Sequence, residues 1–205
     1  MRNALVLILV LTFASLAAAE TNRTIRPDAW AAALEAKGLS NFYKVSDRLY
    51  RSAQPTTEGI AKLKEFGINT VVNLRSFHSD RKKIGNAALV YEQIHMKAWH
   101  PEEEDVVRFL RLVTDESQGP ILVHCQHGAD RTGVMCAVYR VAVQGWTKED
   151  AVKEMTQGGY HFHWMWRNLI TWFKKLDIEK IRKAAGITTA EEKTKAVSVS
   201  AAEVP

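Results

Sequence analysis

The residues from His124 to Gly133, which read His-Cys-Gln-His-Gly-Ala-Asp-Arg-Thr-Gly, constrain the fold of this chain more than any other segment. An apolar run at 120–123 precedes them, and a helix-like run at 134–143 follows. This order predicts a buried strand, a tight loop and the N-terminus of a helix. Such a unit presents backbone N–H groups at the positive end of a helix dipole. The sequence therefore predicts an anion-binding site.

A cysteine and an arginine with five residues between them give this site its chemistry. Arg131 offers a planar fork that matches two phosphate oxygens. The positive field favours the thiolate of Cys125, which is a nucleophile at neutral pH. The loop amides can line a concave phosphate cradle, which predicts phosphate contacts from Gln126, His127, Gly128, Ala129, Asp130 and Arg131.

The pattern His-Cys-x-x-Gly-x-x-Arg-Thr-Gly resembles the signature of the cysteine-dependent protein tyrosine and dual-specificity phosphatases. The resemblance extends from Phe42 to Ile181, and segments 49–55 and 139–146 are similar to the small bacterial exported dual-specificity-like branch. It implies an α/β fold with a mostly parallel central sheet flanked by helices on both faces. It also implies hydrolysis of phosphomonoesters through a cysteinyl-phosphate on Cys125, with no cofactor or metal. The implied partner is a phosphorylated protein or a small phosphomonoester substrate.

Two residues beside the cysteine have a role implied by this resemblance and a plainer alternative. Thr132 would donate its hydroxyl to the cysteine sulfur as the phosphate leaves, or it caps the helix that follows, and the two roles can coexist. His124 would be buried behind Cys125 and fix the loop geometry, or it is an ordinary core histidine.

The general acid is less well defined, because no aspartate precedes the helix expected at 101–116, where many relatives carry one. Glu102 resembles the acid position in its Trp-x-Pro-Glu setting, although acidic residues in a first helical turn also favour the helix dipole. Asp130 resembles the acid proposed in Asp-Arg-Thr loops, or it pairs with a lysine and only shapes the loop. Both carboxylates remain candidates.

The Asp-Arg-Thr loop and nearby basic residues leave the substrate open. Inositol phosphates or phosphoinositides are an alternative to phosphoproteins, with extra phosphates bound by Arg75, Arg81, Lys82, Lys83 or Lys97. A phosphate-binding pseudophosphatase is a third reading. His161 and His163 alternate with aromatic residues, but two histidines alone make a poor metal site, so packing of the last helix is the expected role of this segment.

The chain divides into an expected signal peptide at 1–19, a catalytic domain at 20–187 and a disordered tail at 188–205. Export, most simply to the periplasm, follows from the signal peptide, with no stable membrane span after its cleavage. A formal net charge of +5 without an RNA-binding motif gives no reason to expect nucleic acid. Cys136, the second of two cysteines, is expected in the core rather than in a disulfide. The oligomeric state is left open.

Periodicity and turn residues predict the order of the elements. Strands are expected at 42–45, 48–51, 68–74, 89–96 and 121–124. Helices are expected within 21–37, after Thr56 or Thr57, and at 101–116, 133–144, 148–156 and 164–185.

Overall fold

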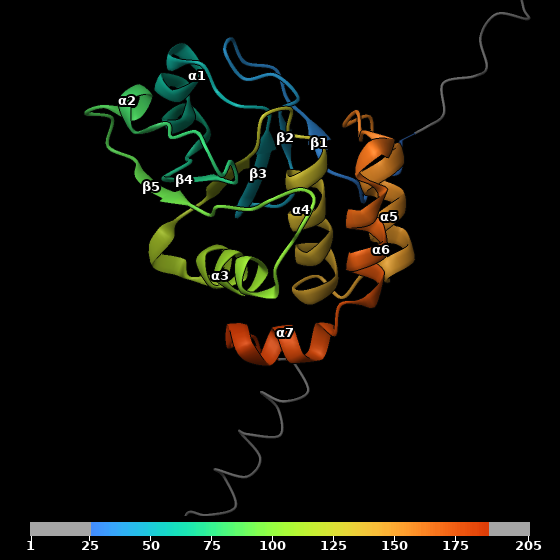
Figure 1. Cartoon of the computed structure of the whole chain (residues 1–205). Coiled ribbons are helices and arrows are strands. Elements are labelled where there is room, and N and C mark those ends of the chain that lie inside the picture. Colours follow the sequence, from blue (N-terminus) through green and yellow to red (C-terminus); the bar gives the residue numbers. More distant parts are fainter. Residues whose placement is uncertain (1–25, 189–205) are drawn as a thin grey trace, which may run out of the picture.

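The computed structural model describes residues 26–188 (Figure 1). The signal peptide predicted at 1–19 and residues 189–205 of the predicted tail lie outside these residues. Within the described part of the chain, no helix combines the length and apolar character needed to cross a membrane.

A six-stranded sheet forms the centre of the described chain, in the order β1-β2-β3-β6-β4-β5. Its strands are β1 (Ala32–Ala33), β2 (Tyr43–Lys44), β3 (Leu49–Ser52), β4 (Thr70–Asn73), β5 (Val90–Gln93) and β6 (Ile121–His124). The first three pair antiparallel, whereas β3, β6, β4 and β5 are parallel. The predicted mostly parallel sheet is therefore confirmed. The carboxyl ends of its parallel strands meet at one edge, where ligands bind in such folds.

Alternate residues of the strands point into two separate cores. Leu49, Val72 and Val123 belong to the larger core, whereas Tyr50 and Leu122 belong to the smaller one on the opposite face. This period of two, with apolar side chains on both faces, is what a sheet covered by helices on each side requires.

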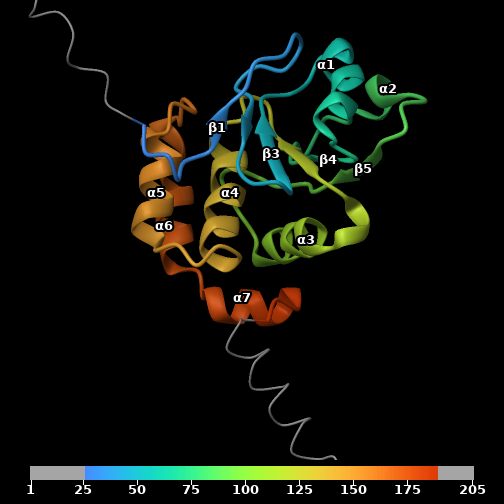
Figure 2. The ribbon, with the colours of Figure 1, turned by 180° about the vertical axis from the view of Figure 1, so that it is seen from behind.

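Seven α-helices cover the sheet within the described residues. They are α1 (Thr57–Lys62), α2 (Arg81–Ile84), α3 (Glu103–Thr114), α4 (Asp130–Ala142), α5 (Lys148–Gln157), α6 (Arg167–Lys175) and α7 (Ile178–Ala185). Short 3₁₀ turns occur at Leu63–Phe66, Glu116–Gln118 and Trp164–Trp166. Figures 1 and 2 show α1 and α2 on one face of the sheet and α3 and α4 on the other. Helices α5, α6 and α7 pack against α4, and α7 also contacts α3.

Two predictions about the helices are wrong. Residues 27–37 form a turn and strand β1 instead of a helix, because Ala32 and Ala33 pair with β2 and the Ala31 N–H donates to buried Glu154 at 2.7 Å. The helix expected at 164–185 is broken into a 3₁₀ turn, α6 and α7. The break between α6 and α7 follows from Asp177, whose side chain accepts the Lys180 N–H and begins a new helix.

Candidate active site

Cys125 follows directly after β6, at the carboxyl edge of the sheet, and only 1 % of its surface is exposed. Residues 125–131, called here the cysteine loop, connect β6 to the first turn of α4. The Leu74 N–H donates to the His124 carbonyl at 2.8 Å, so β4 and β6 remain paired up to the start of the loop. The predicted strand, loop and helix are therefore confirmed, with α4 beginning three residues earlier than expected.

The glycine of the motif allows the loop to lie directly on the end of β3. Gly128 has a φ of +68°, which favours glycine. A Cβ atom there would lie 2.4 Å from the carbonyl carbon and oxygen of Ser52 and 2.5 Å from the Ala53 nitrogen. These neighbours are backbone atoms and cannot move aside. The close approach therefore restricts this position to glycine.

Two side chains and one backbone N–H outside the motif hold the loop in place. Buried Arg51 donates to the Gly128 carbonyl at 2.6 Å and lies over the Tyr160 ring. Asn41 donates to the His127 carbonyl at 2.8 Å. The Gln54 N–H donates to the Gln126 carbonyl at 3.2 Å. Sequence reasoning missed these contacts, because only the pairing of distant segments brings these groups to the loop.

The loop carbonyls thus have partners, whereas the loop amides do not. Within residues 26–188, no backbone N–H of positions 126–131 donates to a protein acceptor. The Arg131 guanidinium lies at the same edge, 3.4 Å from the carbonyls of both Leu74 and Met96. Together these unpaired N–H groups and the guanidinium form a set of donors suited to an anion.

A buried carboxylate supports the loop from behind. The ring of fully buried His124 contacts the Cys125 carbonyl at 3.1 Å through Nδ1, and its Nε2 lies 3.1 Å from Asp80 Oδ2, off the axis of the ring N–H. Burial of Asp80 opposes its ionisation, but the close contact with His124, the hydrogen bond from Gln54 and the charge of Lys83 hold its pKa well below the ordinary value. Sequence reasoning missed Asp80, because a single aspartate between basic residues gives no sign that it is buried.

Thr132 lies at the start of α4 and is fully buried. Its hydroxyl has no hydrogen-bond partner among the described residues. The N-cap of α4 is Ala129, which has no side-chain cap bond, so the alternative reading of Thr132 as the capping residue is wrong. A buried hydroxyl without a partner costs free energy unless a ligand or intermediate satisfies it.

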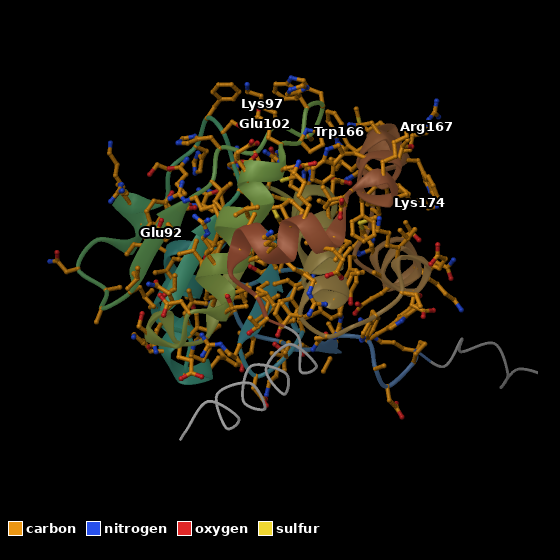
Figure 3. The ribbon with its side chains drawn as sticks, turned by 90° about the horizontal axis from the view of Figure 1, so that it is seen from below. Glu92, Lys97, Glu102, Trp166, Arg167 and Lys174 are labelled. Atoms are coloured by element: carbon orange, nitrogen blue, oxygen red, sulfur yellow. The ribbon has the colours of Figure 1, made fainter. Side chains whose placement is uncertain are left out.

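The candidate acids occupy different surroundings. Asp130 is 5 % exposed, and both of its oxygens contact His163. Oδ1 accepts the His163 N–H at 2.8 Å, and Oδ2 lies 2.9 Å from His163 Nδ1. Glu102 is exposed and precedes α3, six residues after Met96, whose carbonyl contacts Arg131. Figure 3 places Glu102 and Lys97 at the same edge of the molecule. A third carboxyl, Asp105, was missed; its burial and the charges of Glu102 and Glu104 raise its pKa.

The basic residues near the site are partly occupied by internal contacts. Arg75 donates to the Gln54 carboxamide oxygen, and Lys83 pairs with Asp80 at 3.3 Å and donates to the Pro55 carbonyl at 3.0 Å. Arg81 lies over the Tyr91 ring. Lys82 and Lys97 are exposed.

Several phosphatases share the sequence pattern and the fold of this chain. The family model described as a DSP-PTPase phosphatase fused to NAD⁺ kinase matches residues 30–163. The dual specificity protein phosphatase TpbA of Pseudomonas aeruginosa is 36% identical over 168 residues, covering 82% of this chain and 75% of TpbA. A Cys-to-Ser variant of TpbA in complex with pTyr superposes with a TM-score of 0.71 at 33% identity, covering 80% of this chain and 99% of that one. The inositol diphosphatase DSP3 of Arabidopsis thaliana is 28% identical and covers 70% of this chain and 73% of DSP3.

These matches define the class of the protein. The chain belongs to the dual-specificity and tyrosine phosphatase family. The predicted family and the predicted enzyme class, a protein tyrosine or dual-specificity phosphatase, are confirmed.

Proposed function

We propose that the chain hydrolyses phosphomonoesters on proteins through a cysteinyl-phosphate formed on Cys125. The observation that supports this most directly is the cysteine loop itself. Its amides at 126–131 have no acceptor among the described residues, and Arg131 lies at the same edge of the sheet. Donors fixed in advance around a developing charge stabilise a transition state without reorganising at the moment of reaction.

In the first step the Cys125 thiolate attacks phosphorus while Arg131 and the loop amides bind the equatorial oxygens. The phosphorus–oxygen bond to the leaving group breaks, and the leaving oxygen takes a proton from a carboxylic acid. In the second step water attacks the cysteinyl-phosphate and releases inorganic phosphate and the thiolate. The unpaired Thr132 hydroxyl is the group we assign to the departing sulfur, because donating a hydrogen bond there also satisfies it.

The proton donor we assign is Glu102. The two oxygens of Asp130 already contact His163, so neither can protonate a leaving group unless that pair separates. Glu102 is exposed and lies on the segment that leads to α3 from Met96, the residue whose carbonyl contacts Arg131. A donor on such a segment can approach a leaving group without disturbing the loop that binds the phosphate.

The surroundings of the site favour a phosphoprotein over an inositol polyphosphate. Two of the five basic residues available for extra phosphates, Arg75 and Lys83, are held by internal partners. The exposed hydrophobic side chains include Phe77, Trp99, Trp164 and Met165, on segments that follow β4, β5 and α5. Aromatic side chains of this kind are enriched where proteins bind other proteins. The relative TpbA, whose structure contains pTyr, supports the same choice.

Substrate choice is tested by comparing a phosphotyrosyl peptide with an inositol polyphosphate in EDTA-containing, reducing buffer. We expect a higher kcat/KM for the peptide. A preference for the inositol polyphosphate would establish the alternative substrate class, and tight phosphate binding without turnover of either compound would establish a pseudophosphatase.

Substituting the candidate acids should separate their roles. Glu102→Gln is expected to lower kcat for a phosphotyrosyl peptide by about 100-fold or more, because the phenolate then leaves without a proton. The same variant should lose far less activity on p-nitrophenyl phosphate, whose leaving group needs little protonation. The measurement is kcat on both substrates from acidic to neutral pH, where loss of the basic limb identifies the acid.

Three matched variants complete this experiment. Glu104→Gln changes an exposed neighbour in the first turn of α3 and should leave both substrates unaffected. Asp130→Asn is expected to slow both substrates by a similar factor, because it disturbs the loop. If the leaving-group dependence appears instead in Asp130→Asn or Asp105→Asn, that carboxyl is the acid and the assignment of Glu102 fails.

Export to the periplasm is part of the same proposal. Its support is the sequence of residues 1–19, a short basic start followed by an apolar stretch and three alanines. The domain boundaries proposed are 20–187 for the catalytic part and 188–205 for the tail. The mass of the protein recovered from the periplasmic fraction tests the cleavage site after Ala19.

A further inference from the structure

Three side chains that can bind a metal ion lie close together at the cysteine loop. They are His127 in the loop, Asp130 at the start of α4, and His163 in the segment between α5 and α6. One ligand atom of each lies within 4.8 Å of the others. His163 Nδ1 is 2.9 Å from Asp130 Oδ2, and the ring centroids of the two histidines are 5.1 Å apart.

The two segments that supply these ligands are tied together by protein contacts. The His163 N–H donates to Asp130 Oδ1 at 2.8 Å. Asn41 donates to the His127 carbonyl at 2.8 Å and to the Tyr160 carbonyl at 3.1 Å. Asn41 and His161 are the two non-glycine residues with positive φ in the described part of the chain, and both adjoin this cluster. Strained backbone of this kind persists where the surrounding structure holds it, and it is concentrated at ligand sites.

The cluster is open to solvent on one side. An open hollow of about 550 Å³ is lined by His127, His161 and His163 together with Gln126 of the cysteine loop. The buried Asp130 carboxylate lies against His163, behind this hollow. An ion can therefore reach His127 and His163 from solvent, with the Asp130 carboxylate in contact with His163 behind them, and the hollow leaves room for a fourth ligand such as His161 or water.

The donor set selects the kind of ion. Two imidazole nitrogens and one carboxylate oxygen match Zn²⁺ and similar first-row ions, whereas Mg²⁺ and Ca²⁺ favour all-oxygen sites. From sequence, His161 and His163 alone gave no metal site. The fold adds His127 and Asp130, which are 36 and 33 residues away from His163 in the chain.

We propose that His127, Asp130 and His163 bind a divalent transition-metal ion such as Zn²⁺, and that the bound ion inhibits the phosphatase. The inhibition rests on the proposed function, because two of the ligands belong to the loop that binds the phosphate. An ion there holds the side chains of His127 and Asp130 against the 161–163 segment. It also occupies the hollow that Gln126 lines, beside the loop amides that bind the phosphoester, and so hinders that binding.

Binding is tested separately from catalysis, with Co²⁺ as the probe and Cys125→Ser as the background. This background removes the thiolate as a ligand, and burial raises the pKa of the Cys136 thiol to about 11, so that thiol does not compete. The full-length chain is used without a histidine tag. We expect one Co²⁺ per chain by titration calorimetry, with visible absorption bands of nitrogen and oxygen ligation.

Three further substitutions in this background locate the ion. His163→Gln and His127→Gln should each weaken Co²⁺ binding by about tenfold or more. The matched control is His100→Gln, because His100 is an exposed histidine that lies 4.0 Å from a single carboxylate, that of Glu102. Co²⁺ affinity should be unchanged in this control. The metal-free melting temperature checks that each variant folds. Because His127 is exposed, His127→Gln should disturb the fold less than His163→Gln.

Inhibition is measured on chains that keep Cys125. Zn²⁺ should inhibit hydrolysis of p-nitrophenyl phosphate by the wild type, EDTA should reverse the inhibition, and His163→Gln should need about tenfold more Zn²⁺. Unchanged Co²⁺ affinity in both His127→Gln and His163→Gln would overturn the site. Equal Zn²⁺ inhibition of wild type and His163→Gln would overturn the regulation. A chain that binds Co²⁺ at these residues but never hydrolyses a phosphomonoester would contradict the proposed function alone.

Discussion

Cys125→Ser is expected to abolish turnover, with kcat falling by at least about 10⁴-fold, while phosphate and phosphopeptide still bind. A serine hydroxyl stays protonated at neutral pH, and a nucleophile without an adjacent base to activate it is weak. The change removes no loop contact, because the loop is held through its carbonyls and through Gly128. Steady-state kinetics measures the loss, and mass spectrometry of rapidly quenched samples should detect the cysteinyl-phosphate in wild type only.

The second cysteine provides the control. Cys136 lies in the core on α4, where burial raises the pKa of its thiol to about 11. Cys136→Ser should therefore keep kcat near the wild-type value and lower only the stability, since it buries a hydroxyl. If Cys125→Ser retained wild-type turnover, or if both serine variants lost activity equally, the covalent mechanism would be wrong.

The parts of the fold that could be predicted are those encoded by neighbouring residues. Ile121–His124 and the segment from Asp130 to Ala142 combine an apolar strand with a helical pattern around one motif, and both elements form as expected. Thr56, one of the two threonines expected at the start of this helix, caps α1 by accepting the Gly59 N–H. The failures occur where distant residues decide the outcome. Ala31–Ala33 favour a helix by propensity, but pairing with β2 and the contact with Glu154 override it.

The candidate site divides in the same way. The cysteine loop is contiguous in the chain, so its residues could be named from the motif, although their catalytic roles stay predictions. Its supports are Arg51, Asn41 and Asp80, which precede Cys125 by 45 to 84 residues. No local pattern marks them, because an isolated Arg, Asn or Asp is more often exposed. Arg51 is the exception, because the sequence places this charge within an expected strand. A charge that is buried there, as Arg51 is, needs a partner.

Asp80→Asn is expected to lower the free energy of unfolding by about 3–5 kcal/mol, the usual cost of removing one partner from a buried charged network. Asp80 is fully buried and accepts from Gln54 at 2.8 Å and from Asn73 at 2.8 Å, with Lys83 and His124 at 3.3 and 3.1 Å. An asparagine fills the same space, but it removes the charge and turns an NH₂ group toward neighbours that are themselves donors. Urea unfolding at neutral pH measures the difference. Asp47→Asn, which breaks an exposed pair with Lys44, is the matched control and should change the stability little.

The pH dependence distinguishes loss of the charge from a change of shape. Because the pKa of Asp80 is held below its ordinary value, the carboxylate stabilises the fold at neutral pH, and this contribution decreases as the pH falls below about 3.9. The difference in unfolding free energy between wild type and Asp80→Asn should therefore be largest at neutral pH and shrink in acid. A difference that stays constant with pH would show that packing, not the charge, is responsible. A neutral-pH difference no larger than that of Asp47→Asn would mean that the cysteine loop does not depend on this buried carboxylate.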